Sequence, residues 1–237
     1  MCSSDLRDIN PEGRDRSDLA DSASRGRRVA DPEAVPVRPA VSVIMLRDGS
    51  DGLEVFIQHR VSTMDFAADV VVFPGGRVDP VDFDTAPSIA VPDPAVHTSA
   101  WSRSTIAEEA EGWRVLLATA VREVEEETSA VLDPAGLTPW ANWVTPAGMP
   151  KRFDTYFYTT AAGELSSAQH RTTEAHTSEW RSVTGILNAE GDGRLKLMRP
   201  TFVLLRELVD YSSVAEALRA ERSIDPARPE RPSSRGR

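Results

Sequence analysis

The chain has 237 residues, 40% of them hydrophobic, and a formal net charge of −10. This length suffices for one well-cored domain with tails. The negative charge disfavours nucleic acid as the main partner. No apolar run approaches the roughly 20 residues that span a bilayer, and the polar N-terminus lacks the apolar segment of a secretory signal. The single cysteine, Cys2, excludes an intrachain disulfide and a cysteine-rich zinc site, as is typical of a cytoplasmic protein.

Composition divides the chain into one domain and two tails. Residues 1–37 are rich in Asp, Arg and Ser and show no apolar period, so we predict that they are disordered. Residues 224–237 have the same character. The domain is therefore expected to span residues 38–223.

The predicted strands are short runs rich in β-branched and aromatic residues. A turn cluster of Asp and Gly at residues 47–52 separates the first two runs and favours a hairpin. The third run is stopped by Pro74-Gly75-Gly76. The predicted strands cover residues 41–46, 53–58, 70–73, 143–144 and 155–160.

Three helices are predicted from apolar periodicity, at residues 113–128, 202–209 and 214–222, with Ser212 or Ser213 as the N-cap of the last. Residues 79–104 are rich in Pro, Asp, Ser and Ala with little period, and we predict a long inserted loop there. Strands and helices mix without strict alternation, which indicates an α/β fold with a mixed sheet between helices.

Three glutamates converge on one face of the first predicted helix. At about 100° per residue, Glu123, Glu126 and Glu127 fall within an arc of roughly 100°, beside the apolar stripe. Carboxylates this close repel one another, and divalent cations relieve that repulsion. Mg²⁺ prefers oxygen ligands and often bridges carboxylates to substrate phosphates. An acidic run alone is more often a solvated helix face, so the helix needs a second element.

That second element is the Phe73-Pro74-Gly75-Gly76 turn, whose glycines let the backbone approach a ligand closely. Together the two elements resemble the Nudix box of the Nudix hydrolase family. Its pattern is Gly, five residues, Glu, seven residues, then Arg-Glu-apolar-x-Glu-Glu-x-Gly-apolar. Gly76 matches the first glycine, and residues 122–128 match the helical half.

The resemblance implies an α/β/α sandwich with a mixed sheet. It implies that Glu123, Glu126, Glu127 and the Gly76 carbonyl hold Mg²⁺ or Mn²⁺, that Glu123 acts on the attacking water and that Arg122 orients Glu123. The implied activity is hydrolysis of a pyrophosphate bond in a small nucleotide-like substrate, a nucleoside diphosphate linked to another moiety. Nudix domains often form homodimers.

The sequence departs from the box in three places. The spacing from Gly76 to Arg122 is longer than standard, Asp82 stands where the first glutamate is counted, and Ser129 replaces the last glycine. Asp82 receives no role here. Serine in the left-handed conformation usual at that helix end costs ~1 kcal/mol. The long insertion resembles the branch that includes the peroxisomal coenzyme A diphosphatase-like proteins, which points to coenzyme A or an acyl-coenzyme A as substrate.

Other residues are weaker candidates. Arg60, Arg152 and Gly75 are expected to contact substrate phosphates, and Glu174 is a candidate for a further acid or base. The four histidines show no metal-ligand spacing and are interpreted as structural or surface residues.

Three alternatives stay open at this stage. The first is a Nudix-fold module that senses a nucleotide without cleaving it. The second is a hydrolase of a non-nucleotide diphosphate. The third is an unrelated protein with an acidic helix and a Pro-Gly-Gly turn.

Overall fold

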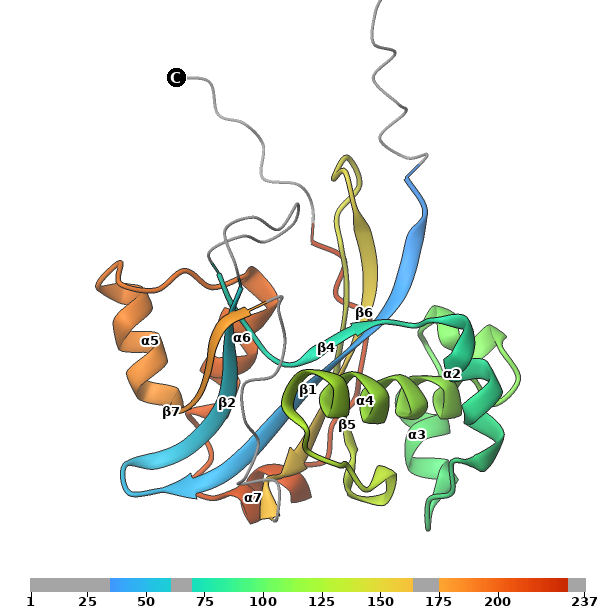
Figure 1. The fold of residues 1–237 in the computed structure, drawn as a ribbon, viewed down its shortest axis with the longest axis horizontal. Coiled ribbons are helices and arrows are strands. Elements are labelled where there is room, and N and C mark those ends of the chain that lie inside the picture. The colour runs from blue at the N-terminus through green and yellow to red at the C-terminus, as the bar shows by residue number, and fades with distance from the viewer. Residues whose placement is uncertain (1–34, 61–69, 164–174, 230–237) are drawn as a thin grey trace, which may run out of the picture.

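The structure is a computed structural model that describes residues 35–60, 70–163 and 175–229. Its sheet has the order β3-β2-β1-β6-β5, with β4 paired to β1 and β7 to β2 (Figure 1). The strands are β1 Val37–Gly49, β2 Gly52–Arg60, β3 Val71–Val72, β4 Gly75–Arg77, β5 Thr138–Val144, β6 Arg152–Ala161 and β7 Ala175–Ser182. The helices are α2 Pro80–Thr85, α3 Pro94–Ala100, α4 Gly112–Thr128, α5 Val183–Gly191, α6 Arg199–Leu208 and α7 Val214–Arg219.

Strand β1 is the centre of the sheet. It pairs antiparallel with β2 through the predicted hairpin and parallel with β6 along ten residue pairs, from Val37↔Arg152 to Leu46↔Ala161. Nearer its N-terminal end, β1 pairs with β4 instead of β2, and Val41 lies opposite Gly76. The sheet is therefore mixed, as predicted, and β1 carries β4 at the place where the glutamates gather.

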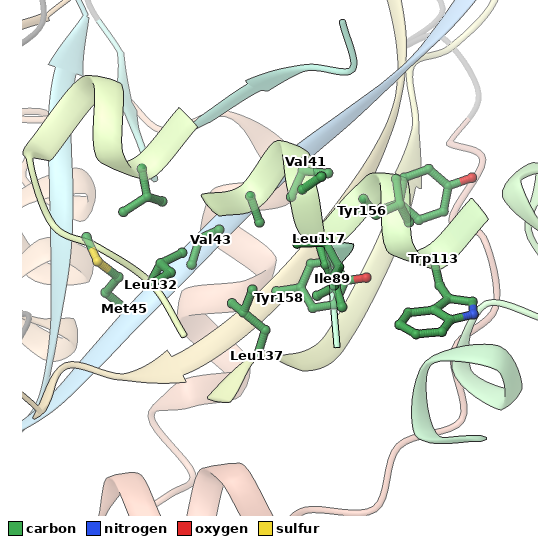
Figure 2. Packing of buried hydrophobic residues seen from close by; sticks show 14 of the residues in the cluster. Val41, Val43, Met45, Ile89, Trp113, Leu117, Leu132, Leu137, Tyr156 and Tyr158 are labelled. Atoms are coloured by element: carbon green, nitrogen blue, oxygen red, sulfur yellow. The ribbon is translucent and has the colours of Figure 1, made fainter. Parts of the chain in front are cut away.

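Helices cover both faces of the sheet, which confirms the predicted sandwich. Alternate residues of β1 point to opposite sides, because successive side chains of a strand face opposite ways. Val41, Val43 and Met45 pack under α4 (Figure 2). Ile44 and Leu46 pack on the other side against α5, α6 and α7. None of the described helices is long and apolar enough to cross a membrane.

Helix α4 matches the predicted helix, beginning one residue earlier at Gly112. Its apolar stripe, including Leu117, Ala120 and Val124, is fully buried against the sheet. The helix ends at Ser129, which has φ 61° and whose N–H donates to the Glu125 carbonyl. The position of the box glycine thus has the left-handed conformation expected of a helix C-cap, taken here by serine.

The predicted loop at residues 79–104 is wrong, because this segment folds into α2 and α3. Each helix begins with an Asp-Pro pair, Asp79-Pro80 and Asp93-Pro94, with aspartate at the N-cap and proline in the first turn. The two helices have six and seven residues. A helix this short spans two turns at most, so it cannot show the apolar period on which the prediction depended.

Buried aromatic side chains attach this insertion to the sheet. Trp101 is 1% exposed, and its indole N–H donates to the Tyr158 hydroxyl at 2.9 Å. His97 is 4% exposed and stacks on Trp113 at the start of α4. A little later, Thr105 donates to the buried Asp154 carboxylate at 2.6 Å. The insertion is therefore packed against β6 and α4.

The structure differs from the sequence predictions in smaller ways too. Gly75–Arg77 does more than end a strand, since it forms β4. Strand β7 and helix α5 have no predicted counterpart, whereas α6 and α7 are confirmed, with Ser213 as the N-cap of α7. Beyond the predicted domain end, Ile224 lies in the core and the backbone of Ala227 hydrogen-bonds to Asn142 and Val144.

Burial lowers the pKa of His97 to about 4, although the charge of Asp93 opposes this. The unfolded chain therefore binds a proton at His97 more readily than the folded chain does. As a result, the stability of the folded state is unaffected by His97 above the ordinary histidine pKa and decreases as pH falls towards 4. Between pH 7 and pH 5 we expect His97 to account for a loss of about 2 kcal/mol in the free energy of unfolding. Urea denaturation of wild type and His97→Phe at both pH values measures it. An equal pH dependence in the two proteins would contradict the assignment.

Candidate metal and catalytic site

The glutamates of α4 lie directly against the backbone of β4. The Gly75 N–H donates to a Glu127 carboxylate oxygen at 3.0 Å. A Cβ on Gly76 would overlap the Glu123 carboxylate, and a Cβ on Gly75 would overlap the Val41 carbonyl. Gly75 also has φ 146°, a conformation that side chains rarely allow. Glycine is therefore required at position 75 for β4 to fit beside β1, and a side chain at position 76 would displace the Glu123 carboxylate.

Arg122 lies at the centre of this cluster. Its Nη1 donates to Glu123 at 2.9 Å and to Glu126 at 3.3 Å, while Nη2 donates to the Arg77 carbonyl at 3.0 Å. The guanidinium thus joins two of the predicted metal ligands to the end of β4. The contact with Glu123 is the one that the resemblance implied for Arg122.

Asp82 holds the other edge of the same guanidinium. Its oxygens accept from Arg122 Nε at 2.8 Å and Nη2 at 2.9 Å, from the Thr119 hydroxyl at 2.9 Å and from the Asp79 N–H at 2.8 Å. Asp82 is 1% exposed. Burial works to raise the pKa of this carboxyl, but the hydrogen bonds from Arg122, Asp79 and Thr119 outweigh it and the pKa is lowered. Asp82 is therefore an ionised anchor for Arg122.

The carboxylates that face the cluster have a different environment. Burial raises the pKa of Glu123; Arg122 opposes this, and the charges of Glu126 and Asp82 add to it. The pKa of Arg122 is raised, chiefly by its hydrogen bond to Asp82, so the guanidinium stays charged. One permanent cation therefore lies among an excess of carboxylates.

The chain was compared with protein families, curated proteins and solved structures. No family model matches the chain, and no curated protein matches it. Among solved structures, a Nudix hydrolase from Alicyclobacillus acidocaldarius superposes with a TM-score of 0.68 at 23% identity, over 80% of this chain and 99% of that one. The chain has the Nudix fold. The Nudix domain of Shewanella oneidensis NrtR complexed with ADP ribose is also similar, with a TM-score of 0.49 at 16% identity over 81% and 96% of the two chains.

The Nudix fold explains which predicted residues lie together. Strand β4 and helix α4 lie together in spite of the long insertion between them, so Glu123 and Glu127 contact the glycines and Arg122 links Glu126 to Glu123. Asp82 belongs to the same place, and sequence reasoning missed its role. The signal was present in the sequence. Five residues separate Gly76 from Asp82, so Asp82 occupies the position at which the box has its first glutamate.

The donor set fits a divalent cation in its chemistry. Three carboxylates and the nearby backbone of Gly76 offer only oxygen, which Mg²⁺ and Mn²⁺ favour. Within the described residues, no three acidic or histidine side chains already converge as a metal site. The reason is visible in the contacts: Glu123 and Glu126 face Arg122, and Glu127 faces the Gly75 N–H. The Glu126 side chain is 60% exposed, so it can turn without disturbing the core.

The other predicted residues lie on β2 and β6 or outside the described residues. Arg60 ends β2, and its backbone N–H donates to the Val70 carbonyl. Arg152 begins β6 opposite Val37, four residues along β1 from the partner of Gly76, which is about 13 Å. The structure therefore does not bring Arg152 to the glutamates. Glu174 lies outside the described residues.

Replacing Asp82 tests its role as anchor. In Asp82→Asn, Arg122 loses its ionised partner in a mostly buried site, and we expect the free energy of unfolding to fall by roughly 3 kcal/mol at pH 7. Because the pKa of Asp82 is lowered on folding, the wild-type advantage is complete above the ordinary carboxyl pKa and disappears as pH falls through the lowered value. Urea denaturation at pH 7 and at low pH measures both effects.

The matched control is Asp84→Asn, an exposed aspartate on the same helix α2. We expect it to change stability by less than about 0.5 kcal/mol. Equal stability losses in the two variants would show that the contact with Arg122 does not hold α2 in place.

Proposed function

We propose that this chain is a divalent-cation-dependent hydrolase that cleaves a pyrophosphate bond in a nucleoside diphosphate linked to another moiety. The observation that carries the proposal is the arrangement around Arg122. Glu123 and Glu127 of one helix lie against the glycine backbone of β4, and the Arg122 guanidinium holds Glu123 and Glu126 beside each other. The Nudix fold of the chain agrees with this activity.

Glu123, Glu126, Glu127 and the Gly76 carbonyl would hold Mg²⁺ or Mn²⁺. When bound, the cation neutralises charge on the diphosphate and makes a water molecule more acidic. Glu123 is partly buried with a raised pKa, which suits it to accept a proton from the attacking water. Arg122 fixes the Glu123 carboxylate through its Nη1 hydrogen bond. The products would be a nucleoside monophosphate and a phosphorylated remainder.

The finer assignment concerns the substrate. We infer that coenzyme A or an acyl-coenzyme A belongs to the substrate range, and the support is the long segment between Gly76 and Arg122. That segment carries α2 and α3 and packs as a folded unit beside α4. Arg60 and Gly75 would contact substrate phosphates, Glu174 is the candidate for an additional acid or base, and the cytoplasm is the compartment.

The first experiment is a substrate panel. Coenzyme A, acyl-coenzyme A, NADH, ADP-ribose, nucleoside triphosphates and diadenosine polyphosphates are incubated with Mg²⁺ or Mn²⁺ and, separately, with EDTA. Cleavage that disappears with EDTA establishes the hydrolase and names its substrate class. Tight binding of one compound without cleavage would instead favour a nucleotide-sensing module. Cleavage of non-nucleotide diphosphates alone would identify a hydrolase of non-nucleotide diphosphates.

Glutamate-to-glutamine replacements on α4 test the site itself. In Glu126→Gln, one proposed ligand loses its charge at an exposed position, so we expect turnover to fall about 100-fold or more while the fold is unchanged. The matched control is Glu125→Gln, since Glu125 is the exposed neighbour of Glu126 on the helix and lies outside the arc of the three proposed ligands. Turnover rates and thermal unfolding of both variants show whether Glu126 is needed for activity rather than for folding. Full activity of Glu126→Gln would overturn the assignment.

A further inference from the structure

A second candidate site lies at the end of the sheet where β5 ends and β6 begins. A hollow there is lined by Val144, Thr145, Pro146, Ala147, Arg152, Arg228 and Pro229. Figure 1 shows the last part of the described chain running beside the β5–β6 hairpin. Two arginines from distant parts of the sequence thus line one hollow, and no acidic residue is among those that line it.

The backbone holds both arginines in position. Val144 donates its N–H to the Ala227 carbonyl at 2.8 Å, and Ala227 donates to the Asn142 carbonyl at 2.8 Å. Arg228 follows directly after this ladder. Arg152 is fixed by its Nε, which donates to the Thr145 carbonyl at 3.2 Å. The two guanidinium groups are therefore carried by paired strand segments rather than by a freely moving tail.

Among the described residues, these two arginines have no acidic partner. Many other arginines of the described chain form ion pairs, such as Arg47 with Glu54 and Arg194 with Asp192. Within residues 35–60, 70–163 and 175–229, neither Arg152 nor Arg228 has an ion pair, and the terminal nitrogens of Arg152 make no hydrogen bond. In a chain with net charge −10, two unpaired cations beside one hollow are a local exception.

We propose that this hollow binds an oxyanion, with a phosphate group as the preferred class. The guanidinium is planar and offers paired N–H donors that match phosphate oxygens. The Thr145 hydroxyl accepts from the Phe153 N–H at 3.0 Å, which leaves its own hydrogen able to donate into the hollow.

The site is separate from the glutamates. Arg152 pairs with Val37 and Gly76 with Val41, so the two sites are about 13 Å apart along β1 and on strands to either side of it. The bound group is therefore not the diphosphate of the proposed reaction. It is either a free phosphate or a second phosphate of a long substrate.

The test is a titration of the full chain with inorganic phosphate in EDTA at constant ionic strength. Calorimetry gives the affinity, and the Nε–H resonances of the arginines report the place of binding. We expect a saturable shift of the Arg152 resonance in wild type. The phosphate affinity from calorimetry should fall about tenfold or more in Arg152→Gln and in Arg228→Gln. Arg228 is exposed, so its replacement tests the site even where Arg152→Gln fails to fold.

Two controls make the result specific. Arg194→Gln removes an exposed arginine that is already paired, and it should leave phosphate affinity unchanged. Glu126→Gln should also leave it unchanged, so this result stays separate from the proposed hydrolysis. Absence of binding in wild type, or equal weakening in Arg194→Gln, would overturn the site. Adenosine 5′-monophosphate binding more tightly than phosphate, in a manner that needs Arg228, would identify a substrate phosphate; equal affinity would identify free phosphate.

Discussion

The ion pair between Asp82 and Arg122 is the contact on which the organisation of the site depends. It joins α2 to α4 across 40 residues of sequence and uses two nitrogens of the guanidinium. Only Nη1 is left for Glu123 and Glu126, which share it. Asp82 already forms an ion pair with Arg122, so Glu123 and Glu126 share a guanidinium that has an acidic partner. A cluster with this excess of carboxylates and only oxygen donors favours a divalent cation.

The insertion has a structural part in this arrangement. Asp82 can hold Arg122 only because the segment that carries it is fastened at a second place. Trp101 provides that attachment through its hydrogen bond to Tyr158, and His97 through its stacking on Trp113. Both contacts are buried, so the segment orders by the same apolar packing that holds α4 on the sheet. The distance in sequence between Gly76 and Arg122 therefore does not loosen the site.

The sequence predicted those parts of the fold that repeat a pattern over many residues. Helix α4 shows its apolar stripe over 17 residues, and β1 and β2 are apolar, β-branched runs on either side of a turn cluster. Helices α2 and α3 were missed because two turns cannot show a period, although their Asp-Pro starts were visible. The glutamates were found because one helix fixes their mutual positions. The distance of Arg152 from the glutamates could not be predicted, because it depends on the register of β6 with β1, which spacing along the chain does not contain.

The arginines of this chain divide into two kinds, and the difference has a consequence for binding anions. Arg122 is surrounded by carboxylates and donates all its hydrogen bonds to the protein, so it has little capacity left for a phosphate. Phosphate at the glutamates would therefore need charge from a bound cation rather than from this arginine. Arg152 and Arg228 line a hollow and have no acidic partner among the described residues, so the phosphate proposed there would need no metal. An acidic protein can thus bind a polyanion at two places by two different means, each set by whether its arginines already have acidic partners.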